Sequence, residues 1–308
     1  MYYFIVNPNS RSGKGALIWK ELRRTLRQKH VSYKAVFTEY RGHAVKLAAS
    51  VTAKASPEHP VYLIAVGGDG TIQGVLSGVK GLSCIYFGYI PTGSGNDFCR
   101  SMQLPQDPHE ALNCILKRKH IASMDVPVIS IKGRKSHFAI SCGIGFDAAV
   151  CHEVGVTPMK KVLNRVGLGK LVYLFVALKQ LLFLKPVPVT LRMDEERIYP
   201  FHKVYFAAVM NQKYEGGGFK FCPDASPSDG YLDVIVVDGL SKLKVLFCLP
   251  TAFWGKHTQF TGIHIFRCKK VEVFSTVPLA VHKDGESAGI QETFSVSIEK
   301  EPVKIILP

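Results

Sequence analysis

Acidic residues are scarce in this sequence. Its 308 residues include 24 Asp and Glu against 39 Lys and Arg, which gives a formal net charge of +15 at pH 7. A molecule of this charge is attracted to nucleic acid, to anionic lipid and to phosphorylated small molecules. The basic residues are scattered and form no basic arm, and no nucleic-acid-binding motif spacing is present. A lipid or nucleotide partner is therefore favoured, and no nucleic acid is expected.

Paired cysteines, a leader segment and a long uncharged apolar run are also lacking. The eight cysteines form no CxxC pair, which predicts buried free thiols in a reducing compartment. Met1–Pro8 is apolar but too short, and too poor in basic residues, for a signal peptide, so a cytoplasmic location is expected. The apolar stretch Val166–Leu184 carries Lys170 and Lys179, which argues against a span through the bilayer.

Apolar residues make up 47% of the chain, enough to bury a substantial core, and 308 residues are long enough for two domains. The first part alternates short apolar runs with helical patterns, which predicts βαβ units and a parallel, Rossmann-like sheet in residues 1–125. These patterned segments are Tyr2–Asn7, Gly13–Lys29, Ser32–Thr38 and His43–Lys54. Two further apolar runs, Val61–Val66 and Ile85–Ile90, read as buried strands that end in glycine-rich loops.

Residues 126–308 are richer in strand patterns. We expect a β-rich antiparallel sandwich, interrupted by a helical insert at Met159–Leu184 and a short helix near Lys242–Phe253, with the last residues packing back on the first domain. The order of the strands is not predictable. The expected strands are Val126–Lys132, Ser136–Cys142, Val187–Arg192, Val204–Met210, Leu232–Val237, Val271–Ser275 and Phe294–Ile298.

The glycine-rich loops are the first candidates for chemistry. Gly67–Thr71 follows a buried strand and precedes a helical run, so its backbone N–H groups and the helix N-terminus could bind phosphate. The competing interpretation is a tight turn in which Asp69 or Thr71 caps the helix. Neither the Walker A spacing nor a full GxGxxG is present, which gives little support to a P-loop NTPase or a dinucleotide-binding dehydrogenase. Because ligands bind beyond the carboxyl ends of parallel strands, this loop and Pro91–Asp97 should face one site.

The residue order in these loops resembles a known superfamily. Gly67-Gly-Asp-Gly-Thr71 resembles the signature of diacylglycerol kinases and NAD kinases, and Pro91-Thr-Gly-Ser-Gly-Asn-Asp-Phe98 is similar to the element of the lipid kinase branch, with Ser94 in place of the usual Thr. Three further segments resemble the diacylglycerol kinase catalytic-domain family, to which sphingosine kinases are related. They are Asn7–Gly15, Ser226–Asp233 and His282–Glu286.

The resemblance implies a fold like that of NAD and diacylglycerol kinases, with ATP as donor, Mg²⁺ as cofactor and a lipid hydroxyl as acceptor in an interdomain cleft. It makes Glu286 the general base and gives Asp69 and Asp97 the positioning of catalytic Mg²⁺. A structural ion would be held by the Asp229 carboxylate and by the Ser226 and Tyr231 carbonyls, with Asp125 linked to it through water. The implied nucleotide-binding residues are Asn7, Ser12, Thr38, Gly67, Gly68, Asp69, Gly70, Thr71, Ile72, Gln73, Ser94 and Asn96.

Several alternatives stay open. Asp229-Gly and Asp284-Gly are also ordinary turn sequences. The acceptor could be diacylglycerol, a sphingoid base, a ceramide-like lipid, phosphatidylglycerol or an undecaprenyl-like alcohol, or instead NAD or a soluble alcohol. The chain could also be a nucleotide-binding regulator. The stretch Leu163–Leu184 predicts either a helix packed on the core or one resting on a membrane, and a peripheral position at the inner leaflet is expected. An exposed sheet edge would support a homodimer.

Overall fold

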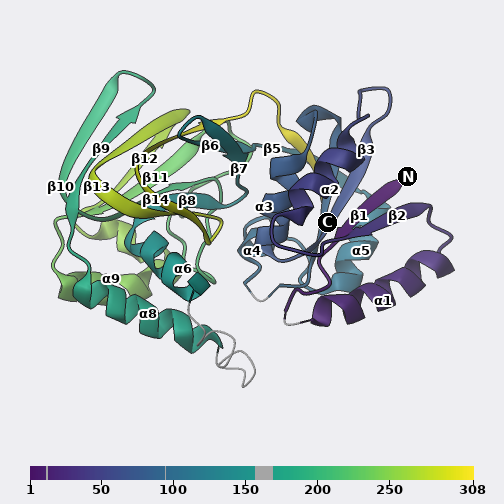
Figure 1. Cartoon of the computed structure of the whole chain (residues 1–308), viewed down its shortest axis with the longest axis horizontal. Helices are drawn as coiled ribbons and strands as arrows, with labels where there is room; N and C mark the ends of the chain where they lie inside the picture. Colours follow the sequence, from purple (N-terminus) through teal and green to yellow (C-terminus); the bar gives the residue numbers. More distant parts are fainter. Residues whose placement is uncertain (12, 94, 157–168) are drawn as a thin grey trace.

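The computed structural model describes residues 1–11, 13–93, 95–156 and 169–308. It contains two domains that lie side by side, and both termini belong to the first (Figure 1). The predictions for Ser12, Ser94 and the first part of the helical insert fall outside the described residues.

The first domain is built on a six-stranded sheet in the order β2-β1-β3-β4-β15-β5. Strands β1 to β4 are parallel, while β15, from the end of the chain, runs parallel to β4 and antiparallel to β5. The bounds are β1 Tyr2–Val6, β2 Tyr33–Phe37, β3 Val61–Gly67, β4 Ile85–Pro91, β5 His120–Met124 and β15 Val303–Leu307.

Helices cover both faces of this sheet. Because β3 is apolar throughout, Ile64 can pack under α1 and α5 while Leu63 packs under α2 and α3, which is the pattern of a doubly covered parallel strand. The helices are α1 Lys14–Gln28, α2 His43–Thr52, α3 Asp69–Gly78, the short turn η1 Leu82–Cys84, α4 Asp97–Ser101 and α5 Pro108–Lys117.

The second domain is a sheet of nine strands that closes on itself. Its main path is β12-β11-β10-β8-β13-β14-β6-β7, and β9 pairs with both β10 and β13. All pairings are antiparallel, so the predicted fold class is confirmed. The bounds are β6 Pro127–Ile131, β7 Arg134–His137, β8 Ser141–Gly145, β9 Val187–Met193, β10 Arg197–Met210, β11 Leu232–Asp238, β12 Ile263–Cys268, β13 Lys270–Lys283 and β14 Glu286–Ile298.

Helices pack on the outside of the closed sheet and share one apolar cluster with it. Within the described part of the chain, no helix is both long enough and apolar enough to cross a bilayer. The helices are α6 Phe146–Val156, α8 Gly169–Phe183 and α9 Lys242–Thr251, followed by the short turns η2 Ala252–Trp254 and η3 Lys256–Gln259.

The strand predicted at Ser136–Cys142 is wrong as a single element. The chain forms β7 and β8 with a break between them, because the N–H groups of Ala139, Ile140 and Ser141 donate to the carboxylate of Asp284 instead of to a neighbouring strand. Strand β12 was not predicted, and β10, β13 and β14 extend well beyond the predicted segments.

Candidate active site

The two glycine-rich loops meet at the carboxyl ends of β3 and β4. The N–H groups of Thr92 and Gly93 donate to the carbonyl oxygen of Gly67 at 2.7 and 3.1 Å. A Cβ atom on Gly93 would lie only 2.7 Å from the Cα of Gly68. Because the backbones approach so closely, a side chain on Gly93 would force them apart. The result is a compact backbone cradle at the N-terminus of α3, where anions are favoured.

The loop after β1 joins the same edge of the sheet. The side-chain amide of Asn7 donates to the Thr71 hydroxyl at 3.3 Å, and the hydroxyl groups of Ser10 and Thr92 lie 2.7 Å apart. A surface hollow of about 240 Å³ next to the cradle is lined partly by Arg11, Gly93 and Asn96. The structure therefore gathers three segments that the sequence marks separately.

Two carboxylates lie together beside this cradle. The N–H of Asp97 donates to Asp69 Oδ2 at 3.3 Å, and Asp97 itself accepts from Arg100 at 2.5 Å and from the N–H of Gly217 at 2.7 Å. Asp69 Oδ1 is buried and accepts no hydrogen bond from the described residues. Burial, with the charges of Asp97 and Asp284, raises the pKa of Asp69 to about 7. This oxygen is placed to take a cation or a proton.

Glu286 reaches the cradle from the second domain. A Cβ atom on Gly70 would lie 2.9 Å from Glu286 Oε1, so this carboxylate rests against the first turn of α3. Its other oxygen accepts from Arg41 Nε at 3.2 Å and from Arg41 Nη2 at 3.0 Å. Sequence reasoning missed Arg41; the available signal was a basic residue shortly after β2, whose carboxyl end lies at the same sheet edge.

A two-residue turn, Asp284-Gly285, holds Glu286 in place. Both residues have positive φ, 47° and 75°, as a type I′ hairpin turn requires. The Asp284 carboxylate accepts three backbone N–H groups at 2.8 to 3.0 Å. Burial still raises the pKa of Asp284, to about 6, against the effect of these bonds. The turn is therefore anchored from inside the protein rather than solvated.

A buried ion group lies behind this turn. His282 Nε2 donates to Asp147 at 2.8 Å and lies 3.4 Å from a Glu215 oxygen. Burial opposes the charge on His282, but Glu215 and Asp147 outweigh it and raise its pKa to about 9. Glu215 belongs to the same loop as Gly217, which binds Asp97. The ion group thus connects the turn that carries Glu286 with the loop that binds Asp97. No sequence motif marks Asp147 or Glu215.

Comparison with known proteins identifies the family. The diacylglycerol kinase catalytic domain model matches residues 1–128, and the YegS C-terminal NAD kinase beta sandwich-like domain model matches residues 141–306. The chain belongs to the diacylglycerol kinase catalytic-domain family.

Relatives within and around the family cover nearly the whole chain. A Bacillus subtilis protein with a provisional name as a lipid kinase, YtlR, is 29% identical over 99% of this chain and 98% of its own length. A diacylglycerol kinase of Mycobacterium tuberculosis is 29% identical over 91% of this chain and 87% of its own length. In fold, the chain resembles a diacylglycerol kinase from Bacillus anthracis (TM-score 0.68, 20% identity, coverage 100% and 96%) and an Archaeoglobus fulgidus NAD kinase solved with ATP (TM-score 0.55, 13% identity, coverage 99% and 93%).

Some residues that the family resemblance marks have other contacts here. The side chain of Ile72 is fully buried in the core, so only its backbone is available to a ligand. The Gln73 amide donates to the His137 carbonyl at 3.2 Å, which links the two domains. Thr38 is buried at the end of β2, and Asn96 accepts from the Tyr89 hydroxyl at 3.3 Å.

The segment expected to hold the family's structural ion forms a separate cluster around Asp125. Asp125 bonds to it directly, by donating to the Pro227 carbonyl at 2.6 Å and accepting from Gly230 N–H at 2.8 Å. Asp229 Oδ1 accepts from Tyr231 N–H at 3.0 Å, while Oδ2 pairs with the Arg267 guanidinium.

Ion binding through Asp229 is therefore a prediction that requires Arg267 to release the carboxylate. The Ser226 hydroxyl lies 3.4 Å from that of Ser228, and the Ser226 carbonyl proposed as a ligand is on the same segment.

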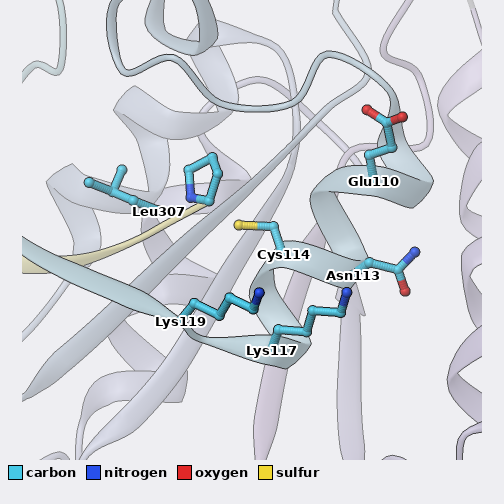
Figure 2. A pocket seen from close by; sticks show the side chains of 7 residues that line it. Glu110, Asn113, Cys114, Lys117, Lys119 and Leu307 are labelled. Atoms are coloured by element: carbon cyan, nitrogen blue, oxygen red, sulfur yellow. The ribbon is translucent and has the colours of Figure 1, made fainter.

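A larger hollow, of about 360 Å³, lies elsewhere in the first domain, between α5 and the end of β15. Figure 2 shows Lys117 and Lys119 beside it, with Glu110 at the opposite end of the helix. None of the residues that the family motifs mark lines this hollow, so we place the chemistry at the glycine loops.

Proposed function

We propose that this protein is an ATP- and Mg²⁺-dependent lipid kinase that moves the γ-phosphoryl group onto a lipid hydroxyl. The observation that carries the proposal is the position of Glu286, whose carboxylate rests against Gly70 in the glycine cradle although it comes from the other domain. A general base for phosphoryl transfer must lie between the phosphate-binding loop and the bound acceptor. A carboxylate at the domain interface beside the glycine cradle meets this requirement. The names of the M. tuberculosis and B. subtilis relatives support a lipid acceptor.

Asp69 and Asp97 fit the metal that such a kinase uses. The Oδ1 of Asp69 is buried and accepts no hydrogen bond from the described residues, and burial with the charges of Asp97 and Asp284 raises its pKa, so a cation at Asp69 would be stabilising. Bound Mg²⁺ would neutralise charge on the transferring phosphoryl group. These two side chains would hold it through their oxygens, the ligands that Mg²⁺ prefers.

Backbone N–H groups, Glu286 and Arg41 carry the remaining roles. Backbone N–H groups of the cradle and the N-terminus of α3 bind the phosphates. Glu286 accepts the proton of the acceptor hydroxyl as the new phosphorus–oxygen bond forms. Because the Arg41 guanidinium occupies one oxygen of this carboxylate, we propose that Arg41 turns from Glu286 to a phosphoryl oxygen when both substrates are bound. Arg41 is 73% exposed in its side chain and has room for this movement.

The test compares Glu286→Gln with Glu292→Gln, a matched change at an exposed position of the same strand, β14. Purified protein is assayed with labelled ATP, Mg²⁺ and lipids in mixed micelles. We expect Glu286→Gln to lower lipid phosphorylation by roughly 10²- to 10⁴-fold, the usual contribution of a general base, with ATP binding unchanged. Glu292→Gln should retain activity. Tight ATP binding without any labelled lipid would favour a soluble alcohol acceptor or a nucleotide-binding regulator.

A further inference from the structure

Helix α8 presents apolar side chains on two faces. Val176 and Leu181 are buried in the cluster shared with the sheet, which satisfies the expectation of a helix packed on the core. Phe175 and Leu182 lie on the opposite side of the helix, Phe183 lies at its C-terminal end, and the three are 59% to 75% exposed. Packing on the core accounts for the first face only, so the second needs its own explanation.

Helix α9 and the turn η2 repeat this arrangement. Val245 and Cys248 are buried, while Leu243, Phe247 and Trp254 are 68% to 73% exposed. The Lys242 side chain of α9 donates to the Leu182 carbonyl of α8, and the two helices run along the same side of the domain (Figure 1). We call the exposed surface formed by Phe175, Leu182, Phe183, Leu243, Phe247 and Trp254 the apolar plate.

The helices of the apolar plate carry lysines and no acidic residue, and Glu153 of the adjacent helix α6 is paired with Lys179. The sequence contains no Asp or Glu from 154 to 193, or from 239 to 271, and these stretches include both helices. Lys185, Lys244 and Lys256 are exposed. A second copy of the chain placed face to face on the plate would bring like charges together, because a twofold interface pairs each surface with itself. An anionic surface is instead complementary to it.

The plate also reaches the catalytic edge. Phe253, next to Trp254, stacks on Phe219 with ring centroids 4.1 Å apart, and a Cβ atom on Gly218 would touch Phe253 at 3.6 Å. The preceding residue, Gly217, donates to the Asp97 carboxylate. A surface seated on the plate would therefore lie beside the loop that holds a catalytic carboxylate.

We infer that the apolar plate docks this protein on an anionic lipid bilayer. Exposed Phe, Leu and Trp side chains enter the boundary between headgroups and acyl chains, and the surrounding lysines contact anionic headgroups. Six large apolar side chains this exposed on two neighbouring helices and the turn η2 are uncommon on monomeric proteins without such a role. The inference rests on the proposed function, in which the acceptor is a lipid, and it names the surface that brings the enzyme to it.

The experiment measures sedimentation of the whole protein with phosphatidylcholine vesicles, with and without phosphatidylglycerol. The test variant is Phe183→Gln with Phe247→Gln. The control is Ile198→Gln with Ile290→Gln, which changes two exposed apolar side chains on β10 and β14. We expect the test variant to lose at least about tenfold in partitioning to phosphatidylglycerol vesicles, and the control to stay within about twofold, because each buried apolar side chain contributes more than 1.4 kcal/mol.

A second variant, Lys244→Glu with Lys256→Glu, should weaken binding to phosphatidylglycerol vesicles and leave binding to neutral vesicles unchanged. Unchanged partitioning of the phenylalanine variant would overturn the inference. So would a wild-type dimer that becomes a monomer in that variant, since the plate would then be a contact between copies. Phosphorylation of a short-chain, water-dispersed diacylglycerol by the variant should equal that of the wild type, and its absence in both would count against the proposed function, not against docking.

Discussion

The role proposed for Arg41, contact with a phosphoryl oxygen, depends on its positive charge. Its guanidinium donates twice to Glu286 although 245 residues separate them in sequence. An exposed ion pair contributes little to stability, so we propose that Arg41 acts in the chemistry. We expect Arg41→Ala to lower kcat by at least about tenfold, or about 1.4 kcal/mol of transition-state stabilisation, with little change in Tm. Arg23→Ala, an exposed arginine on α1, is the control. Full activity of Arg41→Ala would contradict the role given to it.

Arg267 pairs with the Asp229 carboxylate, which was expected to bind a structural ion. Burial, and to a smaller extent the charge of Asp229, raises the pKa values of Asp125 and Asp233, and Arg267 opposes this at Asp233. Arg267→Ala should leave the Asp229 carboxylate free to bind Mg²⁺. At a Mg²⁺ concentration about 100 times Kd, binding stabilises the folded state by about 2.7 kcal/mol, which should raise Tm by several degrees.

The wild type should respond to Mg²⁺ much less, because its guanidinium already pairs with Asp229. Arg192→Ala, which breaks a similar pair with Glu272 on the sheet, controls for loss of an ion pair. Equal Mg²⁺ stabilisation of all three proteins, measured by thermal denaturation with and without chelator, would show that Arg267 does not compete with the ion.

The residues predicted from sequence are those in short motifs. Asp69, Asp97 and Glu286 follow glycine-containing turns whose order resembles a family, and the structure brings all three to one edge of the sheet. Arg41, Asp147 and Glu215 could not be predicted, because their contacts join segments distant in sequence and no local pattern marks them. Gln73 was expected to bind the nucleotide because of its place beside a motif, yet its side chain bonds to the carbonyl of His137 in the other domain.

At the scale of elements, the β13–β14 hairpin depends on the charge of His282. Its folded pKa of about 9 lies above the ordinary 6.5. The pairing with Asp147 and Glu215 therefore stabilises the fold fully below about pH 6.5 and is lost as pH rises through about 9. Glu215 acts in the same direction at lower pH, because burial raises its pKa from 4.5 to about 7 and stability is lost as pH rises through this range. The range above about pH 7 therefore isolates His282.

We expect the stability difference between wild type and His282→Gln to be as much as about 3 kcal/mol near neutral pH and to shrink toward pH 9. Urea unfolding across this range measures it. His59→Gln, at an exposed loop position, should show no such trend. A difference that stays constant from neutral pH to pH 9 would mean that His282 is neutral in the folded protein.

Element prediction succeeded where apolar periodicity was uninterrupted. Strands β3 and β4 were predicted almost to the residue because both of their faces are buried. Strand β12 has one buried position, Cys268, and its other positions, His264 and Arg267 among them, are half-buried or exposed, so its apolar pattern does not stand out. The break between β7 and β8 depends on Asp284, more than 140 residues away, and such a contact leaves no local trace.

For the whole molecule, the decisive feature is that the chain ends in its first domain. Strand β15 lies between β4 and β5, with Val303 and Ile305 on one face of the sheet and Ile306 on the other, all buried. Burial of three such side chains contributes roughly 5–9 kcal/mol at about 1.5–3 kcal/mol each, which is comparable with the total stability of a domain. The first domain therefore should not fold from residues 1–125 alone.

Antiparallel pairing places Val303 opposite Met124, so a short Gly-Ser loop can join residue 125 to residue 302 as a hairpin. We expect residues 1–125 alone to show no cooperative thermal transition. The same fragment carrying residues 302–308 on this loop should melt cooperatively, since β4 and β5 regain their partner. A scrambled version of residues 302–308 controls for added length. If all three fragments melt alike, β15 is an addition to the first domain and not part of what folds it. If only the native sequence restores the transition, the first domain needs β15 to fold. The chain must then leave the first domain after β5 and return to it at β15, and these two crossings help to hold Glu286 against Gly70.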